Sequence, residues 1–91
     1  MQNFLRLPEV CRRTGKPRST VYRDIKDGLL PPPVRIGDRA SAWPDNEIDA
    51  VNQARLAGVS GEEIKQLVAA LVRERHSHAA FNTSPTYVER V

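Results

Sequence analysis

Cysteine pairs and long apolar runs are the first things that this sequence lacks. Its single cysteine, Cys11, has no second cysteine with which to form a disulfide within the chain. No run approaches the roughly 18 apolar residues that a transmembrane helix requires. The first ten residues also lack the continuous apolar stretch of a secretion signal. We therefore expect a cytoplasmic protein that has no membrane partner.

Residue types of catalytic centres are also scarce. The two histidines, His76 and His78, stand near the C-terminal end, and two ligands without a third do not make a metal site. No Ser-His-Asp set, glycine-rich phosphate loop or cluster of metal ligands can be recognised. A chain of 91 residues forms one domain with a modest core, which suits binding better than a deep active site. These absences predict a protein that is not an enzyme and needs no metal or cofactor.

Positive charge, by contrast, is present and is concentrated in one half of the chain. The formal net charge is +3. Residues 1–40 contain nine Lys and Arg and four acids, giving +5, whereas residues 41–75 contain four bases and six acids. The basic half is where a polyanion would dock. The alternative is that these charges only keep a small domain soluble.

The first predicted helix lies in this basic half. Pro8 is tolerated at a first helical position because it has no N–H to lose, and the helix runs to about Thr14. Gly15 ends it. One face carries a stripe of residues spaced for burial, namely Leu7, Val10, Cys11 and Thr14.

A second helix follows a tight turn. It begins at Arg18 or Ser19, of which Ser19 is the better N-cap by residue type, and it stops at Gly28. Val21 and Ile25, one turn apart, form its inward face, and the polar and basic residues point away from them.

Two short helices joined by a turn that contains glycine indicate a helix-turn-helix, whose second helix would enter the major groove of DNA. Arg and Lys there can reach guanine, and Ser and Thr hydroxyls can serve base edges or phosphates. An ordinary helical hairpin with a solvated polar face is the alternative. The residues that we expect to contact DNA in this region are Lys16, Arg18, Ser19, Thr20, Tyr22, Arg23 and Lys26.

Tyr22 has two interpretations, because it lies between the inward and outward faces. It either buries its ring and offers its hydroxyl to a phosphate, which we favour, or serves the core alone.

A β-hairpin is predicted after the proline run 31–33. Val34 and Ile36 alternate with Arg35 across a strand, and the Gly-Asp pair at 37–38 suits a tight turn that places Arg39 at or just after the tip. Beside a helix-turn-helix, such a hairpin is typical of a wing that contacts the DNA backbone or the minor groove through Arg35 and Arg39. Arg35 could instead shield an exposed strand edge.

The second half of the chain predicts two more helices. Trp43 is expected in the core at a strand-to-helix junction, and the helix after it, with Ile48 and Val51 inward, stops at Gly58. Ser60 and Glu63 then form a capping box. The apolar stripe of the last helix consists of Ile64, Leu67, Val68, Leu71 and Val72.

This stripe must be covered by its own domain, by a second copy of the chain or by another protein. From residue 76 onward the sequence has no periodicity, and we expect a flexible tail in which Phe81 and Tyr87 could anchor a partner. The predicted organisation is a DNA-binding domain over residues 1–58, an additional amphipathic helix over 59–75 and a tail over 76–91.

Five motifs stand in order between residues 4 and 56. They are L-x-E-V in the first helix, T-G followed by R-S-T-x-Y in the second, I-K-x-G after it, P-x-P-V-x-I-G in the first hairpin strand, and R-x-x-x-W before an acidic helix. In this combination the segment resembles the AlpA family of phage and mobile-element regulators. That family is related to excisionases and more distantly to the MerR-type winged helix.

The resemblance implies a mainly helical winged helix-turn-helix with a small β-hairpin. It places Ser19, Thr20, Tyr22 and Arg23 on the recognition helix and Arg39 on the wing. It also implies a nucleoid-associated protein that switches promoters of a mobile element or acts as a recombination directionality factor, bending attachment-site DNA for an integrase.

The residues beyond 56 are additions to the family's pattern. Because excisionase-like proteins often bind DNA as adjacent copies, the helix at 60–75 is a candidate for contact between copies or with the integrase. The alternative function is a protein-interaction adaptor that works through this helix.

Overall fold

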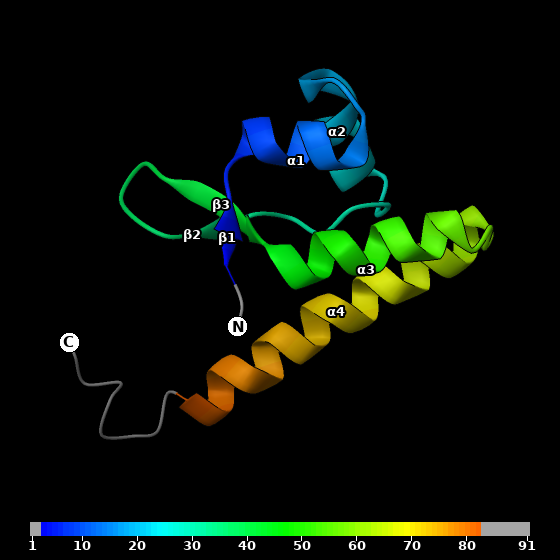
Figure 1. The fold of residues 1–91 in the computed structure, drawn as a ribbon. Coiled ribbons are helices and arrows are strands. Elements are labelled where there is room, and N and C mark those ends of the chain that lie inside the picture. Colours follow the sequence, from blue (N-terminus) through cyan, green and yellow to red (C-terminus); the bar gives the residue numbers. More distant parts are fainter. Residues whose placement is uncertain (1–2, 83–91) are drawn as a thin grey trace.

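The computed structural model describes the backbone of residues 3–82 and the side chains of residues 3–76. It shows a mainly helical chain with a small antiparallel sheet, which is compatible with a winged helix-turn-helix (Figure 1). The elements are β1 (Phe4–Leu5), α1 (Leu7–Thr14), α2 (Arg18–Lys26), β2 (Val34–Arg35), β3 (Ser41–Pro44), α3 (Asp45–Leu56) and α4 (Gly61–Asn82).

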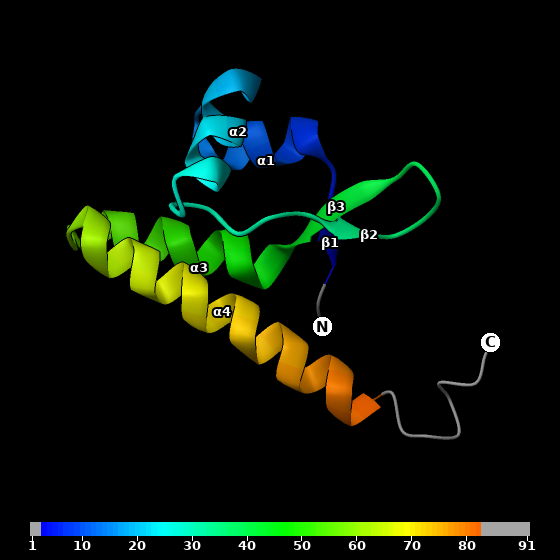
Figure 2. The same cartoon turned by 180° about the vertical axis from the view of Figure 1, so that it is seen from behind.

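The sheet has three strands in the order β1-β3-β2, all antiparallel. Leu5 of β1 lies opposite Trp43, and Val34 of β2 lies opposite Ala42. The loop between β2 and β3 projects from the body at the end away from the α3–α4 turn, and α1 and α2 lie on the other side of α3 from α4 (Figures 1 and 2). The predicted hairpin is therefore present, with β1 as a third strand.

The turn between α1 and α2 follows its local sequence closely. Gly15 has a φ of 72° and its N–H donates to the carbonyl of Cys11 at 2.9 Å, so the predicted helix end is confirmed. The prediction of Ser19 as N-cap was wrong. Pro17 holds the N-cap position with φ −71° and ψ 164°, and its carbonyl accepts the N–H of Val21, because its ring fixes a φ that suits the approach to a helix.

The position of α2 is fixed by a buried carboxylate. Asp24 lies on its inward face, where its Oδ2 is 2.6 Å from the Nζ of Lys16 and 3.8 Å from Nη2 of Arg55 on α3. A buried carboxylate of this kind is stable only when it is paired. The network therefore connects the turn after α1, the middle of α2 and the end of α3.

The helical pair α3 and α4 provides much of the core. The predicted capping box is confirmed, since the N–H of Glu63 donates to Oγ of Ser60 (3.2 Å) and the N–H of Ser60 donates to Oε1 of Glu63 (3.1 Å). Near residue 75 the helix is held again, where Nε of Arg75 donates to Oε2 of the buried Glu47 (3.2 Å) and Nη2 to the carbonyl of Pro32 (3.1 Å). Figures 1 and 2 show α4 running back along α3 and past its beginning.

The apolar stripe of α4 is covered by its own domain. Ile64 and Val68, 3% and 6% exposed, belong to the same cluster as Trp43, Ile48 and Val51. The three remaining stripe residues, Leu67, Leu71 and Val72, pack partly buried against this cluster. Ile64 and Val68 are thus not free for a second copy or a partner, because they cover the apolar side of the chain's own core, whereas contact through the half-buried Leu67, Leu71 and Val72 stays a prediction.

The end of α4 also differs from the prediction. The helix continues to Asn82, past the expected end at residue 75. No proline or glycine stands in residues 76–82, and alanines such as Ala79 and Ala80 have the highest helix propensity. The remainder of the predicted tail, with Tyr87, and the side chain of Phe81 lie outside the described residues.

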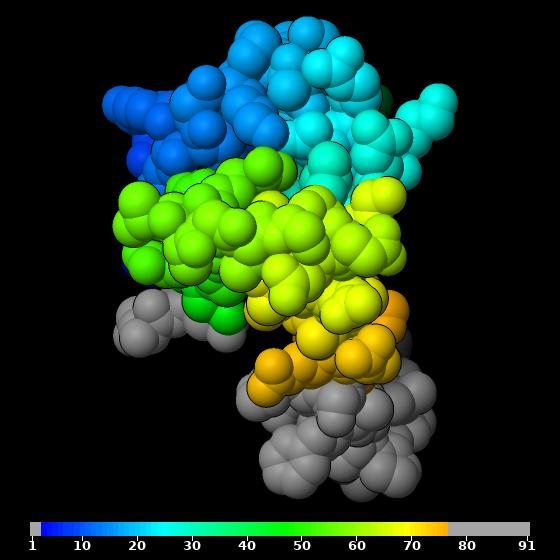
Figure 3. Space-filling model, turned by 90° about the vertical axis from the view of Figure 1, so that its right-hand side faces the viewer, coloured from blue at the N-terminus to red at the C-terminus, as the bar shows by residue number. Residues whose placement is uncertain are grey.

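Within residues 3–82, none of the helices combines the length and the apolar character that a membrane crossing requires. The space-filling view in Figure 3 shows α3 and the beginning of α4 forming one continuous surface with α1 and α2, beyond which α4 extends.

Removing side-chain volume from α4 should destabilise the whole domain. We expect Ile64→Ala to lower the free energy of unfolding by about 2 to 5 kcal/mol, because it opens a cavity in the core. Leu56→Ala, at a position 82% exposed, is the matched control and should change it by no more than about 0.5 kcal/mol. Urea unfolding followed by circular dichroism measures both. Equal stability of the two variants would show that α4 does not complete the core.

The Asp24 network predicts that Lys16 is needed for stability. We expect Lys16→Met to lower the free energy of unfolding by about 1 to 3 kcal/mol, because Asp24 then keeps only the more distant Arg55. Lys26→Met is the control, since Lys26 is exposed and forms no ion pair within residues 3–76. Thermal unfolding at neutral pH makes the comparison, and equal losses in the two variants would contradict the structural role of Lys16.

Candidate nucleic-acid interface

The outward face of α2 is polar and basic. Val21 is fully buried and Ile25 packs against the core, which orients the opposite side of the helix to solvent. Ser19, Arg23 and Lys26 stand on that side at spacings of four and three residues, and all three are exposed. These three predicted residues therefore share one face.

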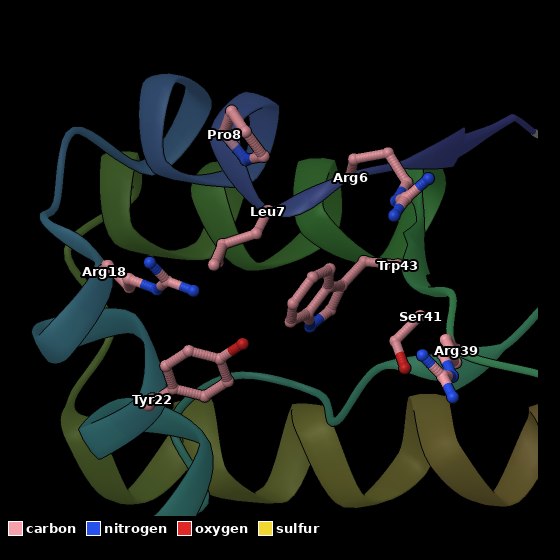
Figure 4. A pocket seen from close by; sticks show the side chains of 8 residues that line it. All are labelled: Arg6, Leu7, Pro8, Arg18, Tyr22, Arg39, Ser41 and Trp43. Carbon is pink, nitrogen blue, oxygen red and sulfur yellow. The ribbon is translucent and has the colours of Figure 1, made fainter.

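The two flanks of α2 differ from each other. Thr20 stands one turn before the buried Asp24, so it lies on the flank toward the ion-pair network and is half-buried. Arg18 and Tyr22 stand on the other flank. Tyr22 is 48% exposed, and its hydroxyl points into a hollow beside α2 (Figure 4). Both interpretations were wrong in expecting a buried ring, and contact of the hydroxyl with a phosphate stays a prediction.

Several basic residues are engaged by carboxylates. Lys16 pairs with Asp24, as described above. Glu9 pairs with Arg12 and accepts a hydrogen bond from Nε of Arg13 (3.1 Å). The hydrogen bond from Arg13, together with the nearby Arg12, holds the pKa of the Glu9 carboxyl below its usual value, so this acid stays ionised and neutralises charge on α1. Arg13 also lies 3.4 Å from Asp49 of α3.

A second group of basic residues has no carboxylate partner. Within the part of the chain whose side chains are described, six residues of the basic half form no ion pair. They are Arg6, Arg18, Arg23, Lys26, Arg35 and Arg39. All six are exposed. Unpaired positive charge therefore gathers on the segment before α1, on α2 and on the hairpin.

The two arginines of the hairpin, Arg35 and Arg39, differ in their hydrogen bonds. Nη2 of Arg35 donates to the carbonyl of Asp38 at 2.8 Å, and the N–H of Ile36 donates to the carbonyl of Ala40 at 2.9 Å. Arg35 thus braces the loop while remaining exposed. Arg39, beyond the Gly-Asp pair, has no hydrogen bond of this kind among residues 3–76.

A hollow of about 430 Å³ lies between α2 and the hairpin. Figure 4 shows Arg18 and Tyr22 reaching into it from α2, Arg39 and Ser41 on the opposite side, and Trp43 between them. The lining residues are Arg6, Leu7, Pro8, Arg18, Tyr22, Arg39, Ser41 and Trp43. None of them is a carboxylate, so the hollow, which we call the arginine groove, suits an anion.

Sequence reasoning missed Arg6 and Ser41 as members of this site. Arg6 is one of the nine basic residues of the first half, and no motif of the sequence singles out Ser41. Arg6 is the N-cap residue of α1, and Ser41 is paired with Arg35 across the hairpin. No spacing rule connects these two positions with α2, since they come to line the same hollow only through tertiary packing.

No group of three or more His, Cys, Asp or Glu side chains that could hold a metal ion occurs among the described residues. The features available for binding are the exposed face of α2, the arginine groove and the hairpin loop.

Comparisons with known proteins cover the part of the chain that carries these features. ORF88, an uncharacterized protein of Enterobacteria phage P4, is 42% identical over 57 residues, which are 63% of this chain and 65% of that protein. The chain therefore covers slightly less than two thirds of that relative's length. No solved structure matches. The model of the family described as "Prophage CP4-57 regulatory protein (AlpA)" matches residues 3–56, from β1 to the end of α3, and this chain therefore belongs to the AlpA family of prophage regulatory proteins.

Proposed function

We propose that this protein binds duplex DNA of a mobile genetic element as a winged helix-turn-helix. In this proposal α2 enters the major groove and the β2–β3 hairpin lies on the backbone or in the adjacent minor groove. The observation that carries it is the separation of charge described above. In the basic half, Arg12, Arg13 and Lys16 pair with carboxylates, whereas the unpaired basic residues stand just before α1, on α2 and on the hairpin.

The chemistry of α2 supports base contacts. Arg23 lies in the middle of the outward face, where a guanidinium can donate two hydrogen bonds to O6 and N7 of guanine. Ser19 stands in the first turn, and the N-terminal residues of a recognition helix contact base edges or phosphates. Lys26, in the last turn, adds charge toward the DNA backbone. The buried Asp24 network would hold this face in one orientation.

The adaptor alternative is weaker on structural grounds. It needs the apolar stripe of α4 on the surface, and that stripe covers the chain's own core. Regulation of the element therefore depends, in our proposal, on DNA contacts at a promoter or at an attachment site. Binding at an attachment site would make the protein a recombination directionality factor with an integrase as its partner.

A footprint of the purified protein across the DNA flanking its own gene tests this function. One short protected site over a promoter would identify a transcription regulator. A long tract of repeated sites beside an attachment site would identify a recombination directionality factor that binds as several copies. Absence of protection at any site at moderate salt would overturn sequence-specific DNA binding.

Arg23 gives a sharper prediction at the residue level. We expect Arg23→Ala to weaken binding to the protected site by about 1 to 3 kcal/mol, because it removes contacts to a base or phosphate while leaving the fold intact. Arg73→Ala is the matched control, because Arg73 is also an exposed helical arginine without an ion pair among residues 3–76, but stands on α4. Fluorescence anisotropy measures the affinities. An Arg23→Ala protein that is folded and binds like the control would remove Arg23 from the site.

A further inference from the structure

The arginine groove has a composition that the folding of the domain does not explain. Its guanidinium groups come from three separate parts of the chain, since Arg6 precedes α1, Arg18 begins α2 and Arg39 belongs to the hairpin. Like charges that converge on one hollow repel each other. No carboxylate lines the groove, so none of its own side chains balances this charge, and an anionic ligand would do so.

The remaining polar groups of the groove are also donors. The hydroxyl of Tyr22 points into it from α2, and Ser41 lies on the hairpin side (Figure 4). The indole N–H of Trp43 is not available, because it donates to the carbonyl of Pro31 at 2.9 Å. The ring is 1% exposed and offers the groove no polar group.

The geometry of duplex DNA suggests what this anion is. Each groove of the duplex is bounded by sugar-phosphate strands, so neighbouring major and minor grooves share one strand as their border. A protein that places one element in the major groove and another in the next minor groove must straddle that strand. The space between its two elements then faces the phosphates.

From this we infer that the arginine groove is a backbone clamp. It holds the sugar-phosphate strand that runs between α2 and the hairpin, with Arg6 and Arg18 on its phosphates and the Tyr22 hydroxyl as a further donor. This inference rests on the proposed function and adds to it a phosphate site that includes Arg6, which lies outside both DNA-contacting elements. The groove volume of about 430 Å³ is within the range of sites that hold a small ligand.

Contacts to phosphates carry no sequence information, and this property distinguishes the clamp from the face of α2. We expect Arg6→Ala to weaken binding about tenfold, and by the same factor for the protected duplex and for a scrambled duplex of equal composition. It should also reduce the slope of log K against log salt concentration by about 0.9, the value for one released phosphate contact. Arg73→Ala again serves as the control and should leave both quantities unchanged.

Methylphosphonate substitution identifies the phosphate itself. Replacing one phosphate at a time along the protected duplex removes its charge at a known position. At the clamped position we expect the wild type to lose about tenfold in affinity, whereas Arg6→Ala or Arg18→Ala should lose much less, because the partner is already absent. Arg6→Lys, which retains the charge, should recover part of the loss.

The outcomes separate the clamp from the proposed function. Binding of Arg6→Ala and Arg18→Ala equal to that of the control, or losses confined to one DNA sequence, would overturn the clamp while DNA binding stands. A wild-type protein that binds no duplex even at low salt would overturn both. Circular dichroism and the thermal midpoint verify that each variant is folded. Arg6 and Arg18 are exposed and make no ion pair within residues 3–76, so neither substitution should disturb the core.

Discussion

The buried indole of Trp43 is the constraint on which the arrangement of helices and hairpin depends. Its ring, 1% exposed, lies on β3 opposite Leu5 of β1, and its N–H donates to the carbonyl of Pro31. One side chain thus connects the central strand, the first strand and the proline segment that follows α2. Because the ring also belongs to the cluster that α3 and α4 complete, burial of the core fixes the distance between α2 and the hairpin. The arginine groove lies on the surface between α2 and the hairpin, so its width depends on that distance.

The buried carboxylates of this domain are paired with basic side chains. Asp24 and Glu47 are buried, and each accepts basic partners that join elements distant in sequence. Such pairs contribute little net stability when compared with apolar residues, but they are costly to break and therefore restrict how the helices can be oriented. What remains is a surface on which arginines have no internal partner. A surface on which several arginines converge without an internal carboxylate partner is suited to a polyanionic ligand.

The fold extends beyond the segment that defines the family. The family match ends at residue 56, yet Ile64 and Val68 of α4 lie in the same core as Val51 of α3. Periodicity alone predicted α4 and its capping box but left its covering surface open between the chain's own core and a partner. The reason is that an apolar stripe specifies that something must cover it and does not specify what. Only the antiparallel packing of α4 on α3 answers this, and Arg75 adds contacts to Glu47 and Pro32 that no spacing rule could indicate.

Local chemistry by itself determined the elements of this protein. Glycine at position 15 ended α1, an apolar pair set the inward face of α2, and alternation indicated the hairpin, although its loop is longer than the expected Gly-Asp turn. These signals are short-range, so they can be read from neighbouring residues. Tertiary structure decided which basic residues were neutralised and which were not. Lys16 is engaged by Asp24, while Arg6 joins Arg18 and Arg39 around one groove, because such groupings depend on distances between elements that only the packed core sets.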